Sequence, residues 1–159
     1  MDIDTTPPAA IEYEVSKEDI AWLKPQAFSF MQQLEGWCSE KKAAILMDIV
    51  LRTKPDIVVE IGVYGGKSLI PMACALNTNR KGVIYGIDPW DNMASLEGVA
   101  NASNIAYWST INLTDIMEKL ILKIRQFNLE DQVRLIQAKS ADVPPIRNID
   151  ILHIDGNHS

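Results

Sequence analysis

The sequence predicts an α/β fold, in which a doubly wound and mostly parallel sheet carries helices on both faces. Four short apolar segments have the composition of buried strands, and segments with helical periodicity precede and separate them. A glycine-rich turn directly follows the first strand segment. Strands that alternate with helices form parallel sheets through right-handed crossovers. The expected strands lie at residues 56–61, 83–88, 133–138 and 149–154.

The composition is that of one globular domain with its own core. The chain has 159 residues, of which 47% are apolar and 23% are charged. We expect residues 1–12 to form a disordered tail, residues 13–55 to form N-terminal helices, and residues 56–159 to form the sheet domain. The tail resembles no secretory signal, and no apolar run is long enough for a membrane span, so a cytoplasmic location is expected. A net charge of −6 without a basic tract argues against a nucleic-acid partner.

The helices before the first strand have clear sequence signals at their ends. Ser16 and Asp19 are suited to cap a helical region at residues 16–33, which we expect to be interrupted at Pro25. A stronger helix is expected at residues 39–53, with Ser39 as its N-cap and Lys54-Pro55 at its end. Its apolar residues form one continuous stripe: Ala43, Leu46, Met47, Val50 and Leu51.

The segments between the later strands differ in regularity. A helix is expected at residues 67–76, with Pro71 near its first turn, and another at residues 113–127. Residues 89–109 are expected to be less regular. Their Tyr107 and Trp108 either line a substrate pocket or pack in the core. Pro144-Pro145 interrupts the segment before the last strand.

The segment Val58–Ser68 carries the strongest functional signal. Gly62, Gly65 and Gly66 allow a tight turn in which a ligand can approach bare backbone, and the N–H groups of the following helix face the same space. This arrangement predicts a nucleotide-cofactor site at the edge of a parallel sheet. Glu60 ends the strand two residues before the first glycine. In a dinucleotide site, a carboxylate at this position would face the negatively charged pyrophosphate. It suits a cofactor that carries a cationic amino acid and no phosphate.

Four motifs in order resemble the class I S-adenosylmethionine-dependent methyltransferases. They are Glu60-x-Gly62-x-x-x-Gly66, GVIYGIDPWD, QAKSADV and IDILHIDGNHS, and the last is similar to a subgroup with an IDG-x-H signature. The resemblance covers residues 39–159. It implies an enzyme with a Rossmann-like fold whose strand order begins 3-2-1-4, and S-adenosylmethionine as its cofactor.

The resemblance also implies roles for residues along the cofactor. Glu60 would contact the methionine ammonium directly or through water, and Gly62, Gly66 and Ser68 would position the donor. Tyr64 stands where the family often has glycine, and would lie near the methionine end.

The adenosine end would involve the second and third strands. Asp88 would accept the ribose hydroxyls, although the same acid would also serve NAD. Trp90 would either pack on the adenine edge or cover the core. Ser140 and Ala141 would lie beside the adenine, or simply form a strand-to-helix turn.

Candidate catalytic residues follow the fourth strand. In metal-dependent members of the family, the acid at the position of Asp155 binds Mg²⁺ and orients the acceptor hydroxyl. His158 is either a general base or a loop histidine in solvent, and His153 is expected to be a satisfied core histidine. The implied reaction is methylation of a hydroxyl on a small molecule or sugar, with Mg²⁺ as a candidate aid.

Two other functions remain open at this point. The first is an NAD-dependent oxidoreductase, although the spacing G-x-x-G-G differs from the G-x-G-x-x-G of dinucleotide sites. The second is a non-catalytic fragment or interaction module. The family fold has seven strands and only four are recognised here, so the fourth is expected to be a bare apolar edge. Either the chain is a fragment or a partner, such as a second copy, covers that edge.

Overall fold

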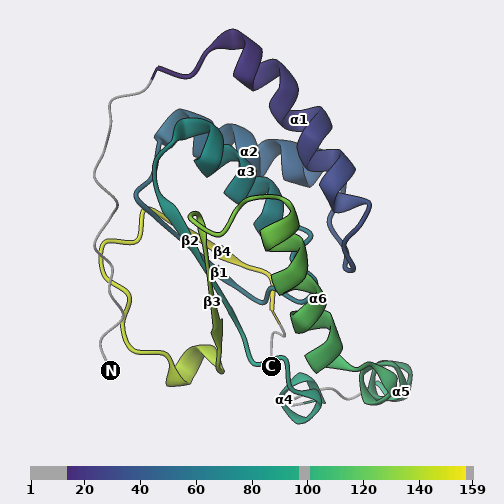
Figure 1. Cartoon of the computed structure of the whole chain (residues 1–159). Helices are drawn as coiled ribbons and strands as arrows, with labels where there is room; N and C mark the ends of the chain where they lie inside the picture. The colour runs from purple at the N-terminus through teal and green to yellow at the C-terminus, as the bar shows by residue number, and fades with distance from the viewer. Residues whose placement is uncertain (1–13, 97–100, 157–159) are drawn as a thin grey trace.

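The computed structural model describes residues 14–96 and 101–156, and shows a four-stranded parallel sheet in the order β3-β2-β1-β4 (Figure 1). The predicted strand order and direction are therefore confirmed. In chain order the elements are α1 (Lys17–Met31), α2 (Glu40–Thr53), β1 (Ile57–Ile61), α3 (Leu69–Asn79), β2 (Val83–Asp88), α4 (Asn92–Leu96), α5 (Ala102–Thr110), α6 (Leu113–Gln126), β3 (Val133–Gln137), the 3₁₀ turn η1 (Ser140–Asp142) and β4 (Ile151–Ile154).

The register of the strands brings four loops to one edge of the sheet. Val58 of β1 pairs with Ile84 of β2 and with Ile151 of β4, and Ile84 also pairs with Val133 of β3. Because the strands are parallel, their carboxyl ends meet at the same edge, which is where α/β folds bind ligands. The segments after β1, β2, β3 and β4 are therefore placed to form one site.

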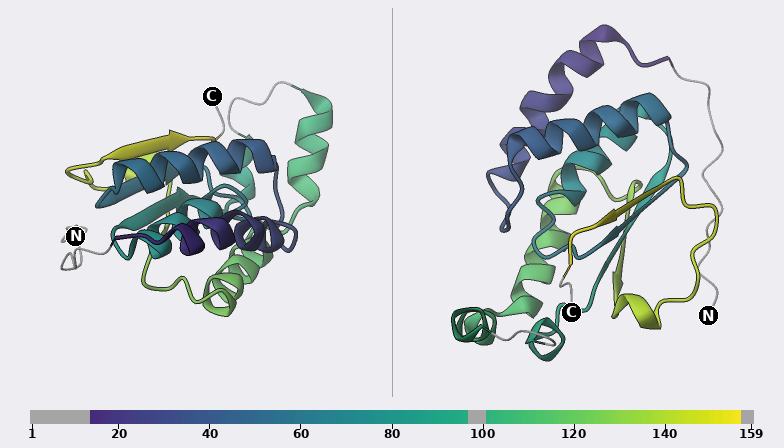
Figure 2. Two further views of the ribbon diagram at one scale, coloured as in Figure 1. Left: turned by 90° about the horizontal axis from the view of Figure 1, so that it is seen from above. Right: turned by 180° about the vertical axis from the view of Figure 1, so that it is seen from behind.

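The two faces of the sheet are covered differently. Val58 and Ile84 face a large core built with residues of α1, α2, α3 and α6. The opposite face, with Val59 and Tyr85, packs against Val143 and other residues of the segment between β3 and β4. That segment loops out on the side of the sheet away from α6 (Figure 2, right). The fold class predicted from the sequence has helices on both faces of the sheet. Within the described residues, the second face carries this irregular segment instead. Pro144 and Pro145 have no backbone N–H to donate to a helical hydrogen bond.

The N-terminal helices confirm the predicted caps and correct one expectation. The Ser16 hydroxyl accepts a hydrogen bond from Asp19 N at 3.0 Å, which completes a capping box. The Ser39 hydroxyl caps α2 by accepting a hydrogen bond from Lys42 N at 3.1 Å. The predicted interruption at Pro25 is wrong, because α1 runs through it. Proline removes one internal hydrogen bond, and burial of the stripe Leu23, Ala27 and Met31 stabilises the helix around it.

Helices α4 and α5 occupy the region that was expected to be less regular. None of the residues described in α4 and α5 is buried. A helix is recognised in a sequence by the apolar stripe that it buries, and these two helices bury no such stripe. Their position depends on the packing of Trp108 against the core and on polar contacts. The Asn92 side-chain amide donates to the carbonyl oxygens of Trp108 at 2.6 Å and Ile111 at 2.8 Å. This contact joins α4 to the end of α5.

Strand β4 has the apolar edge that the sequence predicts. Within residues 14–96 and 101–156 it pairs with β1 and with no other strand. Leu152 is 50% exposed and Ile154 is 55% exposed. Pairing of this edge with a second copy stays a prediction, and the expected tail, residues 1–12, lies outside the described residues. Among the described helices, none combines the length and apolar character needed to cross a membrane.

Candidate cofactor and active site

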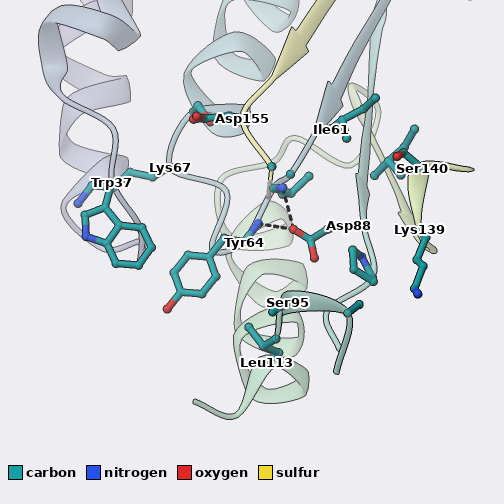
Figure 3. A pocket seen from close by; sticks show the side chains of 18 of the residues that line it. Trp37, Ile61, Tyr64, Lys67, Asp88, Ser95, Leu113, Lys139, Ser140 and Asp155 are labelled. Atoms are coloured by element: carbon teal, nitrogen blue, oxygen red, sulfur yellow. Dashed lines mark hydrogen bonds between the residues drawn. The ribbon is translucent and has the colours of Figure 1, made fainter. Parts of the chain in front are cut away.

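A cavity of about 590 Å³ lies over the carboxyl ends of the strands (Figure 3). Its lining comes from the turn after β1, the end of β2, η1, the end of β4, the loop between α1 and α2, and residues of α4, α5 and α6. Seven of the residues predicted for the site line this cavity: Gly62, Tyr64, Ser68, Asp88, Ser140, Ala141 and Asp155. The structure therefore brings together residues that are up to 93 positions apart in the sequence, from Gly62 to Asp155.

Asp88 fixes the conformation of the glycine turn. Its Oδ2 accepts hydrogen bonds from the backbone N–H groups of Val63 and Tyr64, both at 2.9 Å, and its Oδ1 accepts one from Trp90 N at 2.8 Å. Tyr64 has a φ of 52°, a left-handed conformation that is unfavourable for a residue with a side chain. The two bonds to Asp88 hold Tyr64 in that conformation. Oδ1 accepts only one of these bonds and therefore retains capacity to accept a further hydrogen bond from a ligand in the cavity.

Gly62 is required by a close approach of two backbones. Its φ is 87°, and a methyl group on its Cα would overlap the backbone of Gly156. The turn after β1 is therefore pressed against the end of β4 at the cavity floor. Gly65 is similar, because a side chain there would overlap the carbonyl oxygen of Glu35.

Glu60 lies beneath the cavity and does not line it. The residue is fully buried, and its Oε1 accepts a hydrogen bond of 2.6 Å from Ser68 Oγ and lies 2.8 Å from His153 Nδ1. Its Oε2 has no hydrogen-bond partner within the described residues. Ser68, which does line the cavity, stands between Glu60 and any ligand. His153 is thus a partly buried histidine with a carboxylate partner, in keeping with the structural role expected for it.

Burial raises the pKa of the Glu60 carboxyl above its ordinary value of 4.5, although hydrogen bonds from His153 and Ser68 oppose the rise. The folded protein then holds this proton at pH values where the unfolded chain has released it. The contribution of Glu60 to stability is therefore full below pH 4.5 and is lost as pH rises through the raised pKa.

Urea unfolding from pH 4.5 towards neutral pH should show a decline in wild-type stability that Glu60→Gln lacks. Glu130→Gln, at an exposed site, should follow the wild type. Parallel curves for wild type and Glu60→Gln would refute this account.

Trp90 belongs to the core, and this decides between the two roles left open for it. Its side chain is 2% exposed, and its Nε1 donates a hydrogen bond of 2.8 Å to the carbonyl oxygen of Tyr64. The expected contact with adenine is not available to a side chain in this position. Trp90 instead supports the glycine turn through the hydrogen bond from its indole N–H to Tyr64.

Asp155 is paired with a lysine from the second helix. Lys42 Nζ lies 2.7 Å from Asp155 Oδ2, and both side chains are about 40% exposed. Mg²⁺ requires several oxygen ligands, and no group of three or more His, Cys, Asp or Glu side chains suited to a metal occurs among the described residues. A single carboxylate that already faces an ammonium group does not fit this ion. The other catalytic candidate, His158, lies outside the described residues.

The sequence analysis missed several cavity residues. Trp37 and Lys67 line the cavity near Asp155, and Lys139 lines it near Ser140 (Figure 3). Trp37 precedes a capped helix and belongs to no motif, so only the fold shows that it reaches the site. Lys67 lies inside the glycine motif, and its position at the end of the turn was the available signal.

The fold and the cavity together define a class of protein. A parallel Rossmann-like sheet, a glycine turn after β1 and an acid at the end of β2 form the site of a nucleotide-cofactor-binding α/β domain. Residues 59–159 match a family model described as a methyltransferase domain, and the chain belongs to that family. This assignment favours the methyltransferase over the NAD-dependent oxidoreductase. No curated protein matches the chain in sequence.

Solved structures show the same fold at low sequence identity. An O-methyltransferase from Bacillus cereus in complex with SAH is 18% identical, with a TM-score of 0.52, over 89% of this chain and 55% of that one. SAH-bound PaMTH1 from Podospora anserina is 10% identical, with a TM-score of 0.58, over 94% of this chain and 62% of that one. A third structure is TomG from Streptomyces achromogenes in complex with SAM, an O-methyltransferase involved in tomaymycin synthesis. It is 16% identical, with a TM-score of 0.55, over 93% of this chain and 64% of that one. The chain thus spans 55% to 64% of the length of these proteins.

Proposed function

We propose that the cavity binds S-adenosylmethionine and that the protein transfers its methyl group to a hydroxyl oxygen of a small molecule. The observation that carries this proposal is the continuity of the cavity. It runs from Asp88 and Ser140, past the glycine turn, to Lys67 and Asp155 (Figure 3). An elongated cofactor with a nucleoside at one end and a charged amino acid at the other matches this order of side chains along the cavity.

The end near Asp88 suits the adenosine part of the cofactor. Asp88 uses one acceptor position on Oδ1 and two on Oδ2 for backbone N–H groups, so the carboxylate can still accept a bond from a ribose hydroxyl. Ser140 and Ala141 line the cavity on the neighbouring loop, where the Ser140 hydroxyl can meet the polar edge of the base.

The end near Lys67 suits the charged amino acid. Ser68 Oγ donates a hydrogen bond to Glu60, so the lone pairs of this oxygen can accept a hydrogen bond from the methionine ammonium. Glu60 would then act on the ammonium through Ser68 and not by contact. The Lys67 ammonium lines the same end and suits the methionine carboxylate.

Asp155 and Lys42 would assist the acceptor. The donor supplies an activated methyl group, whose bond to sulfur breaks as the acceptor oxygen bonds to it. Asp155 would take the proton that the hydroxyl loses, and Lys42 would hold the carboxylate in position. The cavity walls keep donor and acceptor aligned and exclude water.

Asp155→Asn tests this proposal in the full chain. We expect release of S-adenosylhomocysteine during methyl transfer to fall by about 10²–10⁴-fold, the usual effect of losing a general base. Affinity for S-adenosylhomocysteine should change little. Asp48→Asn is the matched control, because Asp48 forms an equally exposed pair with Lys24, at 2.9 Å, away from the cavity lining. Transfer by Asp155→Asn at the rate of Asp48→Asn would contradict the assigned role.

A domain that binds the cofactor without turnover is the second candidate. The exposed Leu152 and Ile154 of β4 favour it, because they offer an apolar surface to a further protein segment. Cofactor binding by the wild type, together with no transfer to any hydroxyl compound, would support this second function.

A further inference from the structure

Four aromatic side chains form a continuous surface beside the cavity, which we name the aromatic wall. Its members are Trp37, Tyr64, Tyr107 and Trp108. The Trp37 and Tyr64 rings are stacked with centroids 5.4 Å apart. Trp108 is edge-on to both, at 6.3 Å from Trp37 and 5.7 Å from Tyr64. Tyr107 completes the wall, 5.3 Å from Trp108 and 5.7 Å from Trp37.

The wall is assembled from three separate segments and is largely open. Trp37 comes from the loop between α1 and α2, Tyr64 from the glycine turn, and the other two residues from α5. Trp37 is 67% exposed and Tyr107 is 41% exposed. Single exposed aromatic residues are common, but a cluster of contacting rings beside a cavity marks a binding surface. Three of its members, Trp37, Tyr64 and Trp108, line the cavity itself.

We propose that the aromatic wall binds the acceptor and selects a planar aromatic compound that carries a hydroxyl group. This inference rests on the proposed function and specifies its substrate class. A flat ring can contact aromatic faces and edges at once, as the rings of the wall do with one another. The Tyr64 and Tyr107 hydroxyl oxygens, 3.5 Å apart, offer polar contacts at the rim.

The groups at the neighbouring end of the cavity lead to the same class of substrate. The described residues there offer the Asp155 carboxylate, paired with Lys42, as the group that takes the proton of the acceptor. An aromatic hydroxyl already has a pKa of about 10, as in tyrosine, and therefore needs less activation than an aliphatic one. In the transfer, the methyl–sulfur bond breaks, the methyl–oxygen bond forms, and the aromatic hydroxyl passes its proton to Asp155.

Two probes that differ in planarity test the inference. They are 2-naphthol and its saturated counterpart decahydro-2-naphthol, each titrated by calorimetry into the full chain saturated with S-adenosylhomocysteine. We expect the wild type to bind 2-naphthol about tenfold more tightly than the saturated alcohol, the size of effect that aromatic contacts supply. Trp37→Ala and Tyr107→Ala should each lose most of this preference. Trp22→Ala is the matched control, because Trp22 is 69% exposed on α1 and does not line this cavity.

The outcomes separate this inference from the proposed function. Equal affinity for the two probes, or a Trp37→Ala variant that behaves like Trp22→Ala, would overturn the inference. If the wild type bound S-adenosylhomocysteine normally in that case, the proposed donor site would stand. A wild type that bound no S-adenosylhomocysteine would instead overturn the proposed function.

Discussion

Asp88→Ala is expected to abolish measurable binding of S-adenosylhomocysteine and to lower the free energy of unfolding by about 2–4 kcal/mol. Asp88 accepts hydrogen bonds from the backbone N–H groups of Val63, Tyr64 and Trp90. Alanine would leave these three donors without their charged partner, and it would release Tyr64 from its left-handed conformation. The effect on binding exceeds the loss of a ribose contact, because the turn that shapes the cavity depends on the same carboxylate.

Two further variants make this prediction specific. Asp88→Asn keeps the shape and one acceptor oxygen but places an amide donor against a backbone N–H, so both losses should be intermediate. Asp131→Ala removes an exposed acid between α6 and β3 and should leave both quantities unchanged. The measurements are urea unfolding and calorimetric titration. An Asp88→Ala protein that bound S-adenosylhomocysteine like the wild type would show that the turn does not need this residue.

Gly62→Ala is expected to destabilise the protein by about 3 kcal/mol or more. The added methyl group would meet the backbone of Gly156, and alanine is strained at a φ of 87°. The backbone cannot move without displacing the end of β4 or the start of the glycine turn. Because the turn forms the cavity floor, cofactor affinity should fall together with stability.

Gly156→Ala is the control for this substitution, since it lies on the other side of the same contact. A methyl group on Gly156 would approach Gly62 Cα at 3.5 Å, an ordinary contact distance. Its effect on the free energy of unfolding should therefore stay within about 1 kcal/mol. Urea unfolding of both variants measures the difference. Equal destabilisation by the two would contradict the close approach on which the argument depends.

The sequence was sufficient to predict features that depend on local pattern. Alternating strands and helices predicted the parallel sheet, and Ser16 and Ser39 predicted two helix starts, because capping depends on residues only three positions apart. The expectation at Pro25 failed for the opposite reason. Burial of α1 against the core outweighs the loss of one hydrogen bond, and burial cannot be read from a single segment.

The parts of the site that escaped prediction depend on distant contacts. Lys42 and Asp155 are 113 residues apart, and nothing in either motif indicates that they form an ion pair. Contact of Glu60 with the cofactor, directly or through water, stays a prediction. The sequence did not show that its side chain points into the interior, where Ser68 and His153 bond to it. Trp37 and α5 reach the cavity only because the packing of other elements places them there.

Calorimetric titration of the full chain with S-adenosylhomocysteine tests the donor site most directly, with NADH as the comparison ligand. The account predicts binding of one S-adenosylhomocysteine per chain in the low micromolar range, lost in Asp88→Ala and retained in Asp131→Ala, and no comparable binding of NADH. A folded, monodisperse sample that bound NADH but not S-adenosylhomocysteine would contradict the assignment of the cavity.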